Sequence, residues 1–166
     1  WFETYVPKSL VLRLIRRDGA QAEIPSEERD VTVLFTDIKG FSAMAEKMSP
    51  QDTADWLNRH FTRIAACIEA EGGTVDKFIG DAVMAFWGAP VETADHPRLA
   101  VKTALEMARE IGQINDERRA RKMPEISVGI GLNTGNMCVG DMGSNMRRSY
   151  TVIGDAVNLG ARLEAL

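Results

Sequence analysis

Apolar and polar residues alternate along the first part of the chain with two periods, and each period predicts one kind of element. Residues 31–37 form a short apolar and β-branched run, which predicts a buried strand. From Ser49 and Pro50 to about Ala70, apolar residues recur at steps of three and four, which predicts a helix with one buried face. The residues of that face are Leu57, Phe61, Ile64 and Ile68.

The later part of the chain continues this alternation of strand and helix patterns. Residues 71–88 predict two strands joined by a turn at Gly80 and Asp81, the signature of a hairpin. We expect Asp155 to cap the start of a C-terminal helix. The other predicted elements are a helix over about 95–118, strands over 126–135, 136–143 and 147–154, and the last helix over 155–166.

The apolar positions also predict which face of each later element is buried. The helix over 95–118 is expected to turn inward Val101, Ala104, Leu105, Ala108 and Ile111. The strand over 126–135 alternates, with Ile126, Val128, Ile130 and Leu132 on one face and Gly129 and Gly131 on the other. The last helix is expected to bury Val157, Leu159 and Leu163.

The order of the elements predicts the fold class. Strand, helix, two strands, helix, strands and helix predict an α+β fold with a ferredoxin-like core, a mixed or antiparallel sheet and helices packed on one side. Residues 5–17 predict a short separate helix, and residues 18–30 are polar with Gly and Pro, which predicts a linker. We therefore divide the chain into an N-terminal helix and linker, 1–29, and a domain, 30–166.

Composition limits the partners and the setting. The chain has 166 residues, 45% of them hydrophobic, and a net charge of −4, so one domain with a sizeable core is expected and nucleic acid is not an expected partner. Cys67 and Cys138 lack metal-ligand spacing and predict no disulfide framework, which favours a reducing, cytoplasmic setting. No apolar run approaches the roughly 18 residues that span a bilayer. Because the chain begins with Trp1, we expect a fragment, and an upstream sensor or membrane segment could precede it.

Charged residues stand where the pattern predicts buried strands, and they are the first candidates for chemistry. Lys77 and Asp81 interrupt the apolar stretch "VDKFIGDAV", and Asp37 ends the first strand. If the strands are neighbours, the carboxylates of Asp37 and Asp81 converge and repel unless a divalent cation neutralises them. The alternative is that each aspartate only shapes a turn.

Three further groups of polar residues offer binding chemistry. The turn "FTDIKGF" presents backbone N–H groups that can hold a phosphate if a helix begins after Gly40. Asn158 and Arg162 lie four apart on the last helix and can bind a ribose oxygen and a phosphate. Lys77 and Thr151 can hydrogen-bond a base. The alternative in each case is an ordinary turn or a solvated surface.

Taken together and in this order, five motifs resemble the catalytic domain of the class III nucleotidyl cyclases. The resemblance covers about residues 30–166, and residues 5–17 resemble the connecting segment of sensor-linked bacterial cyclases. The family's domain normally continues past its last motif with further strands and a lysine, so we expect the domain here to be C-terminally incomplete. The motifs are "VLFTDIKGFS", "GGTVDKFIGDAVMAFWG", "VGIGLNTG", "VGDMGS" and "YTVIGDAVNLGARLE".

The resemblance implies a function and a role for each candidate residue. It implies an adenylate cyclase that converts ATP to cyclic AMP and pyrophosphate with two Mg²⁺ or Mn²⁺ ions, in a head-to-tail homodimer with sites between the protomers. Asp37 and Asp81 match the metal ligands. Lys77 and Thr151 match the purine-selecting pair in its adenine form. Asn158 and Arg162 match the residues for ribose and transition state, and Ile38, Gly40 and Phe41 are expected to contact the nucleotide.

Three other functions stay open beside this one. A guanylate cyclase is disfavoured by Lys77, because an ammonium cannot accept the hydrogen bonds that guanine donates. A diguanylate cyclase would carry a different acidic signature, which the chain lacks. A catalytically silent nucleotide-binding or dimerisation module is the alternative that is not an enzyme.

Overall fold

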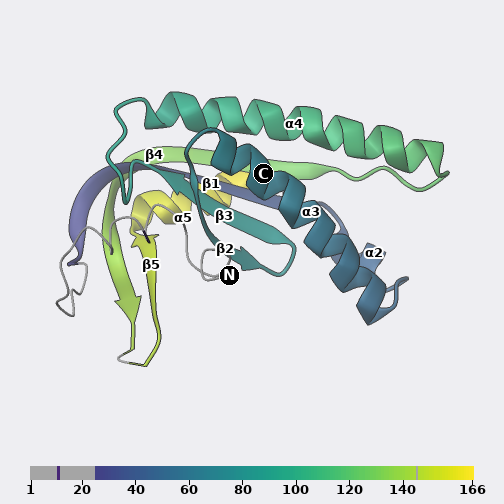
Figure 1. Cartoon of the computed structure of the whole chain (residues 1–166), viewed down its shortest axis with the longest axis horizontal. Helices are drawn as coiled ribbons and strands as arrows, with labels where there is room; N and C mark the ends of the chain where they lie inside the picture. The colour runs from purple at the N-terminus through teal and green to yellow at the C-terminus, as the bar shows by residue number, and fades with distance from the viewer. Residues whose placement is uncertain (1–10, 12–24, 145) are drawn as a thin grey trace.

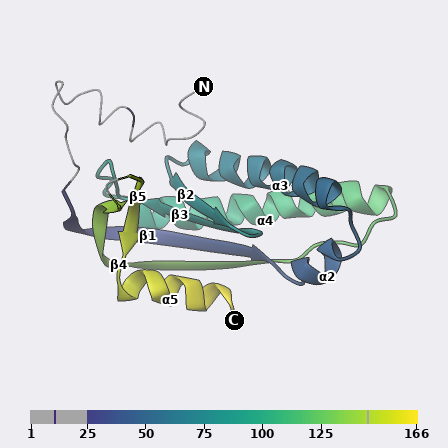
Figure 2. The same cartoon turned by 90° about the horizontal axis from the view of Figure 1, so that it is seen from below.

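The computed structural model describes residues 11, 25–144 and 146–166, and these build a five-stranded antiparallel sheet with helices on both faces (Figures 1 and 2). Along the sheet the strands follow the order β2-β3-β1-β4-β5. Their bounds are Glu27–Ile38 for β1, Thr74–Ile79 for β2, Ala82–Trp87 for β3, Val128–Gly143 for β4 and Arg148–Ile153 for β5. The helices are α2 (Phe41–Ala45), α3 (Pro50–Ala70), α4 (His96–Ala120) and α5 (Asp155–Glu164).

Strand β1 lies at the centre of the sheet and pairs on both sides. Val33 lies opposite Phe86 of β3 and opposite Asn133 of β4. Val31 and Val33 face one side and Leu34 the other, and all three are fully buried. A strand that is apolar on both faces needs cover on both faces, so the position of β1 dictates a three-layer arrangement.

The α+β class and the antiparallel sheet are confirmed, but the expectation that all helices pack on one side is wrong. Figure 2 shows α3 and α4 on one face and α5 on the other. Gly131 and Gly160 make the α5 contact close, since a Cβ on Gly131 would collide with the α5 backbone and one on Gly160 with Val33. The sequence pattern did not reveal that α5 packs there, because these glycines act through a contact distant in sequence.

Helix α3 forms as predicted. The Ser49 side chain accepts a hydrogen bond from the N–H of Asp52 (3.1 Å), and Pro50 occupies the first turn, where its missing N–H costs nothing. Ile64 and Ile68 are fully buried, and Leu57 and Phe61 pack against the same core. The β2–β3 hairpin is also confirmed, with its turn at Gly80 and Asp81.

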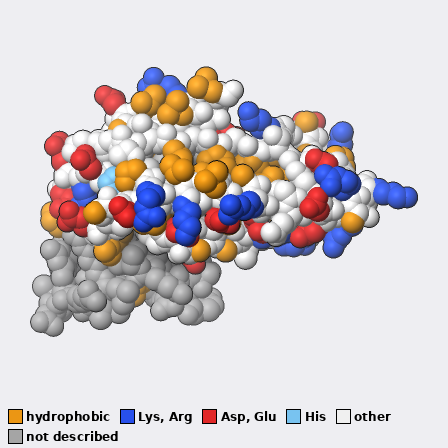
Figure 3. Space-filling model, turned by 90° about the horizontal axis from the view of Figure 1, so that it is seen from above, with side chains coloured by type: hydrophobic (Ala, Val, Ile, Leu, Met, Phe, Trp, Pro, Cys, Tyr) orange, Lys and Arg blue, Asp and Glu red, His pale blue; other side chains and the backbone are white. Residues whose placement is uncertain are grey.

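The buried face predicted for α4 is right in part: Ile111 is buried and Ala104 packs against the core, but Val101, Leu105 and Ala108 are exposed. Val101 and Leu105 are 50% and 59% exposed. Figure 3 shows apolar side chains gathered in the middle of the outer surface on the α4 side of the molecule. This helix has apolar residues on adjacent stripes, so periodicity alone does not decide which stripe is buried. The residues that face the core are Ala100, Thr103, Met107, Ile111 and Ile114.

Helix α5 differs from the prediction in a similar way. Val157 and Gly160 face the sheet, whereas Leu159 and Leu163 are exposed. Asp155 is the first helical residue and not the cap, because Gly154 holds the cap position without a side-chain hydrogen bond. The close approach at Gly160 sets which side of the helix faces the sheet, and the leucines then face outward.

Two strands are longer than predicted. Strand β1 begins at Glu27, inside the predicted linker, because Glu27–Asp30 pair with residues 136–139 of β4. The two strands predicted over 126–143 form one strand, β4, which bends so that its last part and β5 leave the plane of the sheet (Figure 1). The helix predicted over 5–17 lies, apart from Val11, outside the described residues.

No helix in the described part of the chain is both long enough and apolar enough to cross a membrane.

Candidate active site

Asp37 and Asp81 meet at one end of the sheet. Asp37 lies at the end of β1, and Asp81 lies in the turn between β2 and β3, the neighbour of β1. The Ile38 N–H donates to Asp37 Oδ1 (2.7 Å) and to Asp81 Oδ2 (3.1 Å). One backbone donor therefore holds two carboxylates that are more than forty residues apart in sequence.

This pair carries more negative charge than its surroundings balance. The pKa of Asp37 is raised to about 6, first by its hydrogen bond with Asp81, then by burial and by the charge of Asp81. Glu164 of α5 lies close enough that burial and the charge of Asp37 raise its pKa too, against a lowering by Lys39. Among the described residues, no group of three or more Asp, Glu, His or Cys side chains is arranged to hold a metal ion. The candidate ligands at this end of the sheet are the two carboxylates.

The segment after Asp37 turns sharply into α2. Gly40 has a left-handed backbone conformation (φ 71°) that favours glycine, and it precedes the first residue of the helix, Phe41. The Ile38 N–H, one of the predicted nucleotide contacts, is already engaged by the two carboxylates. The backbone N–H groups of Gly40 and Phe41 lie at the start of the short helix, where N–H donors have no hydrogen-bond partner within the helix.

Lys77 and Thr151 are brought together by a residue between them that the sequence analysis did not single out, Asp76. The Thr151 hydroxyl donates to the Asp76 carboxylate, and Lys77 Nζ lies 3.7 Å from its other oxygen. The Asp76 side chain is 1% exposed, and burial raises its pKa while Thr151 and Lys77 lower it. The signal that could have identified it is its place beside Lys77, since it is a further charge within an apolar stretch.

A local irregularity in β2 sets the direction of these side chains. Val75 pairs with Ala85 and Lys77 with Met84, so Asp76 is the extra residue of a β-bulge. A bulge redirects side chains and breaks the regular alternation. The bend of β4 carries β5, with Thr151, out of the plane of the sheet, which allows the two edge strands to meet at Asp76.

Asn158 and Arg162 lie exposed on α5. In the part of the chain that the structure describes, neither side chain has a hydrogen bond or ion pair, including with Asp37, Asp81 or Lys77. Within one chain, the two aspartates therefore meet at one place and Lys77, Asp76 and Thr151 at another. Asn158 and Arg162 of α5 have no polar partner in the described part of the chain.

Most of the chain matches one known family. A family model described as the adenylate and guanylate cyclase catalytic domain matches residues 24–166. The chain belongs to this family. Adenylate cyclase 1 of Rhizobium meliloti is 35% identical over 165 residues, which cover 99% of this chain. The chain spans only 25% of the length of that relative, so it corresponds to one part of a larger protein there.

Solved structures of cyclases share the fold. The adenylyl cyclase CyaB from P. aeruginosa superposes with a TM-score of 0.81 at 33% identity, covering 85% of this chain and 74% of that one. The guanylyl cyclase Cya2 superposes with a TM-score of 0.79 at 34% identity, covering 84% and 71%. These adenylyl and guanylyl cyclase structures are about equally similar to this chain. Overall similarity therefore does not separate ATP from GTP as the substrate, and individual residues must be considered.

Proposed function

We propose that this cyclase domain converts ATP to 3′,5′-cyclic AMP and pyrophosphate. The observation that carries the proposal is that this chain contains two separate groups of polar side chains. One is the converging carboxylates of Asp37 and Asp81, and the other is the Lys77–Asp76–Thr151 group. The first is suited to divalent cations and the second to the edge of a purine.

The two carboxylates fit a cation site by their chemistry. They are hard oxygen ligands, the type that Mg²⁺ and Mn²⁺ prefer, and they are held close enough to raise the pKa of Asp37. Two bound cations would stabilise the attacking and the leaving oxygens of a phosphoryl transfer. We assign Asp37 and Asp81 as their ligands.

The Lys77 group fits adenine better than guanine. Because the Thr151 hydroxyl donates its proton to Asp76, its oxygen is left to accept a hydrogen bond, while Lys77 only donates. Adenine presents one acceptor, N1, beside one donor, the N6 amino group, which this pair matches. Guanine reverses this order, with an acceptor at O6 and a donor at N1–H, so Lys77 placed at N1 and Thr151 placed at the 6-position would each face a group of its own kind.

The remaining residues serve the sugar and the phosphates. The ribose 3′-hydroxyl loses its proton to solvent and attacks the α-phosphorus, the bond to the bridging oxygen breaks, and pyrophosphate leaves with that oxygen. Arg162 meets the negative charge that develops on the α-phosphate, and Asn158 orients the ribose. The backbone N–H groups of Gly40 and Phe41 contact the phosphates of the nucleotide.

We further propose that each site lies between two copies of the chain, with Asp37 and Asp81 from one protomer and the other side chains from its partner. Three facts support this arrangement. Asn158 and Arg162 make no hydrogen bond or ion pair with the aspartates within the described part of one chain. Lys77 keeps 44% of its side chain exposed. Exposed apolar side chains adjoin these residues and are suited to an interface: Phe78, Ile79, Ile153, Leu159 and Leu163.

The test is turnover by the natural full-length protein with ATP or GTP, each with Mg²⁺ or Mn²⁺. We expect cyclic AMP from ATP and little cyclic GMP from GTP. A preference for GTP would make it a guanylate cyclase. Nucleotide binding by a folded dimer without turnover under either metal would refute the enzymatic proposal and favour a silent binding module.

A further inference from the structure

A cavity of about 550 Å³ lies between α3 and α4, apart from the residues assigned to nucleotide chemistry. None of Asp37, Asp81, Lys77, Thr151, Asn158 and Arg162 lines it. Its walls come from α3 and from the C-terminal half of α4 with the turn that follows. They include Trp56, His60, Arg63, Ile114, Arg118 and Met123.

Arg118 contributes a buried positive charge to this cavity. The residue is 8% exposed, and burial lowers its pKa, although a guanidinium stays protonated in proteins. Its Nε donates to the carbonyl of Pro124, its Nη2 lies 3.8 Å from Met44 Sδ, and its guanidinium carbon lies 5.8 Å from the centre of the Trp56 ring. All three partners are uncharged.

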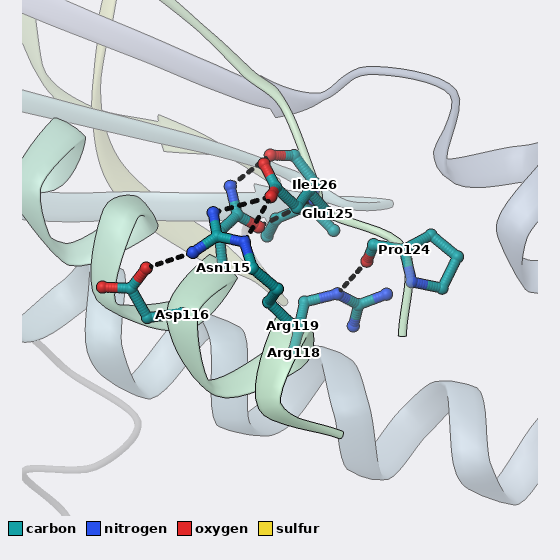
Figure 4. Close-up of polar contacts among 7 residues, drawn as sticks. All are labelled: Asn115, Asp116, Arg118, Arg119, Pro124, Glu125 and Ile126. Atoms are coloured by element: carbon teal, nitrogen blue, oxygen red, sulfur yellow. Dashed lines mark hydrogen bonds and ion pairs between the residues drawn. The ribbon is translucent and has the colours of Figure 1, made fainter. Parts of the chain in front are cut away.

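The next residue shows how an arginine in this region is normally balanced. Arg119 pairs with Asp116 (2.8 Å) and Glu125 (2.7 Å), whereas Arg118 points to Pro124 and away from these carboxylates (Figure 4). Among the described residues no carboxylate pairs with Arg118. Burying a charge without a counterion is unfavourable, so the fold leaves this cation with unused capacity for an anion.

His60 also lines the cavity and is neutral. The residue is 4% exposed, and its Nδ1 is buried with no hydrogen-bond partner in the described chain. Burial, and to a lesser degree Arg63, lowers its pKa to about 4, so the ring is neutral at pH 7 and can donate from one nitrogen. His60 therefore adds no charge to the cavity at pH 7, and the uncompensated cation of Arg118 is the group that indicates a ligand.

We propose that this cavity binds a small organic anion, with its carboxylate or phosphate group on Arg118 and its apolar body against Trp56, Ile114 and Met123. The volume is in the range of small-molecule sites and far exceeds an inorganic ion. Arg59 and Arg121 also line the cavity and add positive potential, while Glu117 is occupied by Arg63 (3.0 Å). This site does not depend on the proposed cyclase activity.

The test uses benzoate, phenyl phosphate and inorganic phosphate as probes at constant ionic strength, with binding measured by calorimetry. We expect at least one of the two organic anions to bind saturably, one per chain, and to bind more tightly than inorganic phosphate. Which organic anion binds better distinguishes a carboxylate site from a phosphate site. Perturbation of the Trp56 indole signal in NMR spectra would locate the binding at this cavity.

Variants connect the binding to the residues. Arg118→Met should weaken binding of the organic anion by at least about tenfold, because a charge-assisted contact is lost. Arg109→Gln is the control, since Arg109 lies on the same helix, pairs with Glu106 and does not line the cavity. Met123→Trp should also weaken binding by filling the cavity from an exposed position, whether or not Arg118→Met folds.

Three outcomes would overturn the proposal. One is no saturable binding of either organic anion by the folded wild type. Another is binding of inorganic phosphate as tight as that of both organic anions. The third is binding that persists unchanged in Arg118→Met or, where that variant does not fold, in Met123→Trp.

Discussion

The acidic pair at the end of β1 and the cavity between α3 and α4 each hold charge that the rest of the described chain does not neutralise, and the two charges are of opposite sign. At the first, Asp37 and Asp81 bring two negative charges together, and the nearby Glu164 adds a third. At the second, Arg118 buries a positive charge among uncharged partners. Elsewhere the described chain pairs its partly buried charges, as in Arg63 with Glu110 and Glu117.

The difference in sign between the two regions indicates what each is suited to bind. Folding alone does not favour like charges in contact or a buried charge without a counterion, so both arrangements are explained by a ligand of opposite charge. The acidic pair suits cations and the cavity suits an anion. Trp56 of the cavity wall connects the two regions, since it stacks on His60 (5.3 Å) and on Phe41 (5.9 Å), which follows Asp37 by four residues.

The largest expected effect comes from removing one charge of the acidic pair. Asp81→Asn should lower cyclase turnover by at least about a hundredfold, because a metal ligand is lost. The fold should stay intact, since Asp81 lies in a turn, and stability without metal should not fall because the repulsion is relieved. Turnover and thermal unfolding measure both effects, with Asp55→Asn on the outer surface of α3 as control. Normal turnover would contradict the metal assignment.

The cavity should respond to acid through His60. Its pKa is about 4 in the folded protein and about 6.5 in the unfolded chain, so the unfolded chain binds the proton more tightly. Stability is therefore present above pH 6.5 and is lost as the pH falls toward 4, by up to about 3 kcal/mol. Urea unfolding at a series of pH values measures this loss. Subtracting the stability profile of His60→Phe from that of wild type removes the contributions of the other titrating groups. Parallel profiles for the two proteins would contradict the assignment.

The acidic pair should respond to pH in the opposite direction. The pKa of Asp37 is raised to about 6 from an ordinary 3.8, so its contribution to stability is full at low pH and is lost as the pH rises through about 6. Without metal at pH 7, Asp37→Asn should be more stable than wild type. Added Mn²⁺ should stabilise wild type and reverse the order. If Asn at this position lowers stability at pH 7 without metal, the two carboxylates do not repel.

The smallest effect compares a balanced arginine with the unbalanced one. Arg63→Met should lower the free energy of unfolding by about 1 kcal/mol, since it leaves Glu110 and Glu117 without their partner. Arg118→Met removes a buried charge that lacks a counterion and should cost less, or stabilise the protein. Urea unfolding of the two variants side by side decides it. A larger loss for Arg118→Met would mean that its uncharged contacts balance the charge.

Local pattern predicted much of this molecule. The α3 stripe, the hairpin and the end of β1 follow from residues near one another in sequence, and the hairpin register then places Asp81 beside Asp37. What it missed depends on distant contacts. Asp76 points to Thr151 because of a bulge and a bend, and α5 covers the second face because of Gly131 and Gly160. The missing counterion of Arg118 can be recognised only from the full set of its neighbours.

The most direct test of the shared site mixes two inactive variants of the full-length protein. Asp37→Ala and Arg162→Ala should each be nearly inactive alone. In a mixed dimer one cleft carries both lesions and the other carries none, so one intact cleft is restored. With random exchange about half the dimers are mixed, and cyclic AMP production should recover to roughly a quarter of wild type. A mixture no more active than its parents, despite confirmed subunit exchange, would contradict a site shared between two protomers.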